Sequence, residues 1–108
     1  MLLMVGDPFD ALGDQHRREI LRLLADADRS VAELAGALPI SRPAVSRHLR
    51  VLKQAGMVSE EPVGTRRIYR LQAEGALAVQ RYLQQVWGDA GARFRLFADN
   101  TEPRSADD

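Results

Sequence analysis

Residues 41–58, SRPAVSRHLRVLKQAGMV, decide how the chain folds, because four Arg or Lys side chains and one His, but no acid, alternate there with Val and Leu. At 100° per residue, Val45, Leu49 and Leu52 fall within an arc of about 60°. The opposite and flanking arcs hold polar and basic residues: Arg42, Pro43, Ser46, Arg47, Arg50, Lys53 and Gln54. The pattern predicts one helix, from Ser41 to Gly56, with an aliphatic buried side and a basic exposed side.

The preceding segments are also helical in pattern. A short helix is expected at 8–12 and a longer one at 14–27, with an aspartate as its N-cap. Ser30 and Glu33 have capping-box spacing, so a third helix begins there and ends before Pro39. A short helix, a tight turn and a basic helix together favour a helix-turn-helix.

A hairpin and a last helix follow the basic helix. Residues 57–61 and 66–71 have strand character and are separated by the turn formers of PVGT. Residues 73–87 form the last long helix, which Gly88 and Gly91 are expected to weaken or kink. Whether the helix continues past these glycines, through Phe94, Leu96 and Phe97, stays open at this point. The fold class is therefore mainly α with a small β-hairpin: a winged helix-turn-helix with additional N- and C-terminal dimerisation helices.

Length and composition indicate one domain. The chain has 108 residues, of which 45% are hydrophobic and 28% are charged. We expect the winged helix-turn-helix with its terminal helices to span residues 1–98. Residues 99–108 are mostly polar and acidic, and are expected to form a disordered tail.

The charge of the chain balances overall but is unevenly placed. Residues 41–70 hold seven Arg or Lys and two acids, whereas the remainder holds eight basic and thirteen acidic residues. A basic segment inside a neutral chain is the pattern of a nucleic-acid binder. On charge alone, an ordinary solvated helix face explains it equally well.

Other features point to a cytoplasmic protein. The N-terminal MLLMV is too short for a signal peptide and lacks its basic lead-in, and no apolar run approaches the length of a membrane span. The chain has no cysteine, which excludes disulfides and thiolate metal sites.

Three runs, FDALGDQHRREILRLL, SVAELAGALPISRPAVSRHLRVLKQAGMV and IYRL, resemble the ArsR-type winged helix-turn-helix repressors over about residues 8–87. The resemblance implies a homodimer that binds an inverted-repeat operator and represses transcription. It assigns Arg17 to a structural role or a phosphate contact. It implies that the recognition helix contacts DNA through Ser41, Arg42, Pro43, Val45, Ser46, Arg47 and His48, and the wing tip through Thr65, Arg66 and Arg67. The exposed Arg50 lies on the same face of the recognition helix and is expected to contact DNA as well.

Metal sensing is not supported by the family's known routes. Many relatives use a Cys-x-Cys motif in the third helix, or His and acidic residues on the last helix. Here SVAELAGAL has no thiol, and AEGALAVQRYLQQVW has no histidine and one acid. His16 is interpreted as an interior or boundary residue, and His48 as a phosphate contact or a packing residue. Two histidines on different helices do not supply three or four ligands, so no metal and no cofactor is expected.

A dimer interface is expected where the two chain ends meet. The last helix has an apolar arc about 140° wide at 100° per residue. Such an arc can pack onto the helix's own winged-helix core, and it is wide enough to form a dimer interface as well. The N-terminal segment carries further apolar side chains that are hard to bury. The interface is predicted to contain Leu2, Leu3, Phe9, Val79, Leu83, Val86 and Trp87.

The sequence therefore favours a homodimeric, sequence-specific DNA-binding regulator, with double-stranded DNA and a second copy as partners. It identifies no effector ligand. The alternative is a winged-helix module whose basic face binds an acidic protein. A dimerisation domain of a methyltransferase-like enzyme is a weaker alternative, because the chain is short for a catalytic domain and no catalytic set of residues stands out.

Overall fold

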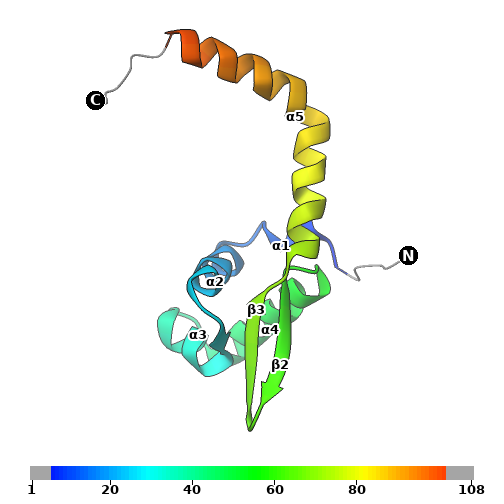
Figure 1. Ribbon diagram of the computed structural model, residues 1–108. Helices are drawn as coiled ribbons and strands as arrows, with labels where there is room; N and C mark the ends of the chain where they lie inside the picture. The colour runs from blue at the N-terminus through cyan, green and yellow to red at the C-terminus, as the bar shows by residue number, and fades with distance from the viewer. Residues whose placement is uncertain (1–5, 102–108) are drawn as a thin grey trace.

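The computed structural model describes residues 6–101, with the side chains of residues 6–89 (Figure 1). Its elements follow in the order α1 (Pro8–Ala11), α2 (Gln15–Asp26), β1 (Arg29–Ser30), α3 (Val31–Ala37), α4 (Arg42–Gln54), β2 (Val58–Val63), β3 (Arg66–Leu71) and α5 (Ala73–Thr101). The predicted fold class, a mainly helical chain with a small antiparallel hairpin in a winged helix-turn-helix arrangement, is confirmed.

Side-chain caps fix the starts of the helices, as the sequence predicts. Asp14 accepts from the Arg17 amide at 3.0 Å at the start of α2. Ser30 and Glu33 form the reciprocal capping box of α3, at 3.1 and 2.8 Å. After α4 the chain turns at Gly56, whose φ of 72° favours glycine because a side chain at that angle is strained.

The sheet is larger than predicted. It has three antiparallel strands in the order β1-β3-β2, and β1, which the sequence did not reveal, pairs Arg29 with Tyr69. The strand β2 also continues to Val63, two residues beyond the expected end, and so includes Pro62. Pro62 is tolerated because β2 is an edge strand, where a missing N–H leaves no inner neighbour unpaired.

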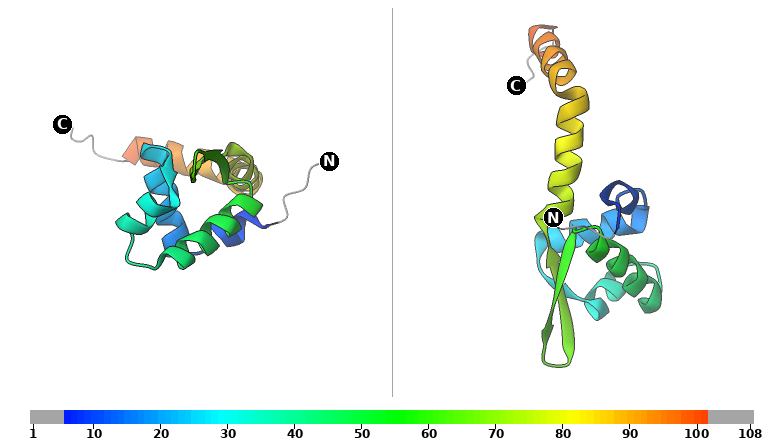
Figure 2. Two further views of the ribbon diagram at one scale, coloured as in Figure 1. Left: turned by 90° about the horizontal axis from the view of Figure 1, so that it is seen from below. Right: turned by 90° about the vertical axis from the view of Figure 1, so that its right-hand side faces the viewer.

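The core lies between α2, α3, α4 and the base of the sheet. Its largest fully buried side chains are Ile20, Leu34, Val45, Leu49 and Leu52. Three of these form the predicted aliphatic stripe of α4, so the basic helix is held by its buried side. Figure 2 shows the hairpin leaving this group as a narrow two-stranded arm.

The last helix is longer than the range 73–87 expected for it. It continues from Ala73 to Thr101 without a break at Gly88 or Gly91, although the ribbon bends in its second half (Figure 1). A glycine in a helix costs only about 1 kcal/mol, which neighbouring turns can offset. The helix also passes the expected domain boundary at residue 98, and residues 102–108 of the predicted tail lie outside the described residues.

A close backbone approach anchors the start of α5. The Gly75 amide donates to the Gly56 carbonyl at 2.8 Å, and a Cβ at Gly75 would lie 2.2 Å from the Ala55 carbonyl oxygen. From this anchor α5 leaves the domain at the end opposite to the hairpin tip (Figures 1 and 2).

Candidate nucleic-acid interface

The helix α4 presents the two faces that its sequence predicts. Val45, Leu49 and Leu52 are each 0% exposed. The exposed side carries Arg42, Pro43, Ser46, Arg47 and Arg50. Ser41 caps the helix by accepting from the Ala44 amide at 3.2 Å.

The hairpin of β2 and β3, here called the wing, supplies a second set of basic side chains. The wing turns at Gly64, with a φ of 63°, and Thr65, Arg66 and Arg67 follow this turn. Arg66 lies 3.4 Å from Glu33 of α3, and both side chains are about half exposed. This exposed pair is weak enough to be exchanged for another anion.

A network of hydrogen bonds around Glu60 holds the wing onto α4. Glu60 accepts from Lys53 at 3.1 Å, from Arg67 at 2.9 Å and from the Tyr69 hydroxyl. The hydrogen bond from Tyr69 outweighs desolvation and, with Lys53 and Arg67, lowers the pKa of Glu60. Burial and the bond to Glu60 raise the pKa of Tyr69 to about 12. Glu60 therefore stays ionised and Tyr69 stays protonated at neutral pH, which keeps the wing in place.

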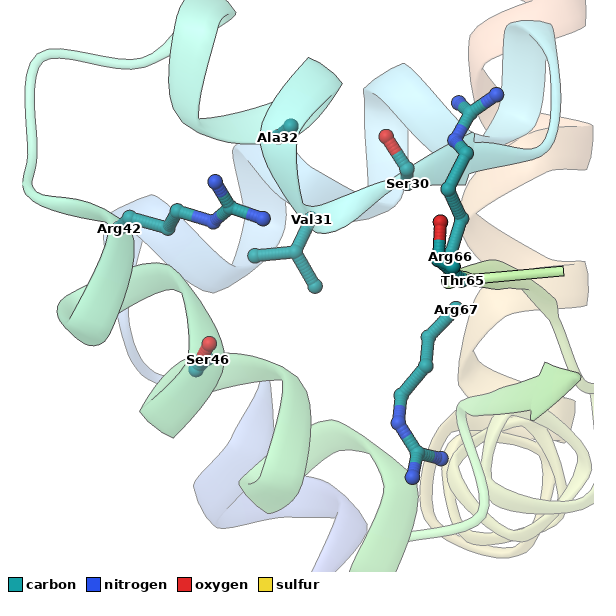
Figure 3. A pocket seen from close by; sticks show the side chains of 8 residues that line it. All are labelled: Ser30, Val31, Ala32, Arg42, Ser46, Thr65, Arg66 and Arg67. Carbon is teal, nitrogen blue, oxygen red and sulfur yellow. The ribbon is translucent and has the colours of Figure 1, made fainter. Parts of the chain in front are cut away.

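A groove of about 280 Å³ lies between the start of α4, the start of α3 and the wing. Figure 3 shows Arg42 and Ser46 on one side of it, and Arg66 and Arg67 on the other. Three arginines around one open groove create a positive site of the size and chemistry that a nucleic-acid phosphate requires.

The arginines divide into two groups. Within residues 6–89, Arg66 and Arg67 form ion pairs with carboxylates, whereas Arg42, Arg47 and Arg50 form none. The side chains of α4 are therefore available to an incoming ligand without breaking an existing pair. The remaining wing arginine, Arg70, is bound to Asp28 and Glu61 at 3.1 and 2.8 Å.

Comparison with known proteins places this arrangement in a family. The family described as "Bacterial regulatory protein, arsR family" matches residues 14–60. The HTH-type transcriptional regulator Rv2034 of Mycobacterium tuberculosis is 48% identical over 92 residues, which cover 85% of this chain and 86% of Rv2034. The chain belongs to the arsR family.

Further similarities agree with the arsR assignment. The transcriptional repressor SdpR of Bacillus subtilis is 40% identical over 60 residues, covering 56% of this chain and 67% of SdpR. The crystal structure of a possible transcriptional regulator for arsenical resistance is 36% identical, with a TM-score of 0.70, covering 89% of this chain and 98% of that one. This arsR-family protein is a DNA-binding transcription regulator.

Two residues that the ArsR resemblance assigns to DNA lie elsewhere in this arsR protein. The assignment of Val45 as a DNA contact is wrong, because its side chain is 0% exposed and belongs to the core. His48 is turned toward α2, and only 18% of its side chain is exposed. Its Nδ1 accepts from Arg17 at 3.2 Å, so of the two roles left open for His48 the structure favours packing. Desolvation dominates and lowers the pKa of His48, which makes the ring neutral at pH 7.

Of the two roles predicted for Arg17, a structural role and a phosphate contact, the structure favours the structural one. Its Nε donates to the Ala11 carbonyl at 2.8 Å and its Nη2 to the Asp10 carbonyl at 3.2 Å. These bonds satisfy carbonyls at the end of α1, and a third bond reaches His48. Arg17 thus connects α1, α2 and α4 on the side of α4 away from its exposed arginines.

The structure also brings together residues that the sequence analysis kept apart. Asp14, His16 and His48 offer ligand atoms that all lie within 4.8 Å of one another. The two histidines come from separate helices, and the N-cap carboxylate of Asp14 lies beside them as a third candidate ligand. The hydrogen bond from the Arg17 amide lowers the pKa of Asp14 most, so its carboxylate is ionised.

The apolar side of α5 is largely uncovered in the single chain. Phe9, Leu83, Val86 and Trp87, all predicted interface residues, are 44–53% exposed. Phe9 and Trp87 both meet Tyr82 edge-to-face, with ring centroids 5.2 and 6.3 Å apart. Val79 instead packs partly against the core, and Leu2 and Leu3 lie outside the described residues.

A groove of about 440 Å³ continues this apolar side toward the domain, lined mainly by Leu12, Leu21, Met57, Leu71, Ala76 and Val79.

Among the described residues, none of the helices combines the length and apolarity that crossing a bilayer requires.

Proposed function

We propose that this regulator is a homodimeric repressor that inserts α4 into the DNA major groove at each half of an inverted-repeat operator. One observation carries the proposal: the unpaired arginine and serine face of α4 lies beside the arginine-lined groove of the wing. A major groove admits one α-helix, and residues near the start of such a helix reach the base edges.

The two basic surfaces have different roles in this proposal. Arg47 and Arg50 project from α4, where a guanidinium donates two hydrogen bonds to the O6 and N7 atoms of guanine. Ser46 and Pro43 fit against neighbouring bases, and Ser41 and Arg42 lie where the backbone passes the start of α4. Arg66 and Arg67, with Thr65, exchange their carboxylate partners for phosphates, which adds affinity without sequence preference.

The dimer interface is proposed along the exposed apolar side of α1 and α5, here called the α1–α5 surface: Phe9, Leu83, Val86 and Trp87, with Val79 at its inner edge and Leu2 and Leu3 from the N-terminal segment. A two-fold dimer must hold its recognition helices about 34–36 Å apart. The α1–α5 surface suits this spacing because α5 leaves the domain opposite to the wing tip (Figure 1).

Repression follows from occupying the operator, and the relative SdpR is itself named a transcriptional repressor. We place the protein in the cytoplasm, where its DNA is, and assign it no enzymatic activity and no cofactor for DNA binding. The domain is proposed to extend through the end of α5 at Thr101.

Replacing Arg47 by Ala should cost about 1–3 kcal/mol of affinity for operator DNA obtained by selection from random duplexes. The loss on scrambled DNA should be smaller, since no base contact exists there.

Replacing Arg66 by Ala should weaken binding to both DNAs about equally and reduce the salt slope by about one. Fluorescence anisotropy titrations at several salt concentrations measure the affinity of each variant for operator and for scrambled DNA, and the salt slope of each.

The matched control is Arg81→Ala, which removes the same charge from the exposed side of α5, away from α4 and the wing. It should bind both DNAs like the wild type. Equal losses on both DNAs for Arg47→Ala would exclude base reading by Arg47. A protein with no sequence preference and tight binding to an acidic partner would support the interaction-module alternative instead.

A further inference from the structure

The cluster of Asp14, His16 and His48 lies behind the recognition helix, outside the surface proposed to contact DNA. Asp14 and His16 come from the start of α2, and His48 comes from the middle of α4. The two imidazole rings have centroids 5.8 Å apart, and the His48 Nε2 lies 4.0 Å from the Asp14 Oδ1. All three residues are half-buried, so the site is sheltered but reachable from solvent.

We propose that Asp14, His16 and His48 bind one divalent transition-metal ion, of which zinc fits best, with water completing the coordination. Two imidazoles and one carboxylate are a common zinc ligand set, with bonds of about 2.0–2.2 Å. Tetrahedral geometry at those lengths separates the ligand atoms by about 3.3 Å. Since the ligand atoms here lie within 4.8 Å, side-chain rotation has to close only about 1.5 Å.

The ligand atoms are available without unfolding a helix. The cap of α2 uses the Asp14 Oδ1, which accepts from the Arg17 amide at 3.0 Å, and this leaves Oδ2 for a metal. Within residues 6–89, the His16 side chain makes no hydrogen bond, and neither does the His48 Nε2. The cap bond also orients the carboxylate, as outer hydrogen bonds commonly do for metal ligands.

Arg17 sets the cost of binding. A guanidinium only donates, so the His48 Nδ1 accepts the bond from Arg17 and its ring proton sits on Nε2. A metal at Nε2 displaces that proton and leaves Nδ1 protonated, so the bond to Arg17 is lost. Arg17 keeps its bonds to Ala11 and Asp10, so one hydrogen bond of three is given up. We therefore expect the affinity for zinc to be moderate.

This site differs from thiolate sites and from sites on a last helix, because it connects the start of α2 directly to the recognition helix within one chain. Its existence does not depend on the proposed operator or dimer. Failure of the metal site would leave the account of DNA binding intact.

The test is a calorimetric titration of the metal-stripped full-length protein with zinc chloride in a buffer that does not coordinate metals. We expect one zinc per chain. His16→Gln and His48→Gln should each weaken binding at least tenfold. Asp14→Asn should also weaken it, and because Asn caps a helix as well as Asp, this variant keeps α2 intact. Glu19→Gln, which removes a carboxylate from the same helix outside the cluster, should bind zinc like the wild type.

Two further readouts connect zinc to these residues rather than to acidic residues elsewhere. Zinc at 100 times its Kd should raise the melting temperature of the wild type by at least about 5 °C and that of His16→Gln by about half as much or less. Cobalt should give visible absorption bands of a four- or five-coordinate site, and these should vanish in His16→Gln. Circular dichroism shows whether each variant folds, and His16 is the decisive position because its side chain holds no structural bond within residues 6–89. Absence of stoichiometric zinc binding, or binding to His16→Gln with the wild-type affinity, would overturn the proposal.

Discussion

Leu83→Glu should turn the dimer into a monomer and lower operator affinity by about 100-fold or more. The Leu83 side chain is 48% exposed in the single chain, so the substitution leaves the core of the domain unchanged. In the dimer the same change buries an unpaired carboxylate or forces the α1–α5 surface open. In a dimer, binding of the first recognition helix holds the second one at a high effective concentration near its half-site, which commonly raises the overall affinity by a factor of 10²–10⁴. A monomer binds one half-site only and lacks this gain.

Sedimentation velocity and operator titration measure the two effects, and circular dichroism checks the helices. Gln85→Glu is the matched control, because it introduces the same charge on the opposite, polar side of α5. Trp87→Glu, at a position 53% exposed, should repeat the result of Leu83→Glu. If both apolar-side variants remain dimeric and bind the operator normally, the interface lies elsewhere.

Leu49→Ala should lower the free energy of unfolding by about 2–5 kcal/mol. Leu49 is 0% exposed and lies on the buried side of α4, directly under the DNA-facing arginines. Truncation removes apolar burial and leaves a cavity that the close-packed core fills only in part. Since a small domain is stable by only about 5–15 kcal/mol, this is a large fraction of the total.

Urea unfolding at one fixed protein concentration measures the loss, because the stability of a dimer depends on concentration. Gln54→Ala, at an exposed position near the end of the same helix, should change stability by less than about 0.5 kcal/mol. A loss for Leu49→Ala as small as that of Gln54→Ala would mean that α4 is not held by its aliphatic stripe.

Local signals in the sequence predicted most of the fold correctly. The capping box of Ser30 and Glu33, the Asp14 cap and the left-handed turn at Gly56 each depend on residues within one helical turn. The period of the aliphatic residues in α4 likewise predicted which side is buried. Assigning Val45 to DNA contradicted that same period, because a residue of the buried stripe cannot also face the groove.

Features that depend on tertiary packing could not be predicted in the same way. Two residues, Arg29 and Ser30, are too short a segment to reveal β1, which exists only because β3 lies alongside it. The meeting of Asp14 with His48 requires α2 and α4 to cross at one particular register, across more than thirty residues of sequence. The continuity of α5 through Gly88 shows that one helix-weakening residue does not decide where a helix ends.

Selection of bound fragments from a pool of random duplex DNA tests the central claim most directly. Inserting two α4 helices through a two-fold dimer predicts enriched fragments with two inverted half-sites. Their centres should be one helical turn, about 10–10.5 base pairs, or a multiple of it apart. The preference at the base pairs that Arg47 contacts should relax with Arg47→Ala and persist with Arg81→Ala. A pool that gains no shared sequence, or a shared sequence without inverted symmetry, would contradict the account of a dimer reading a palindromic operator.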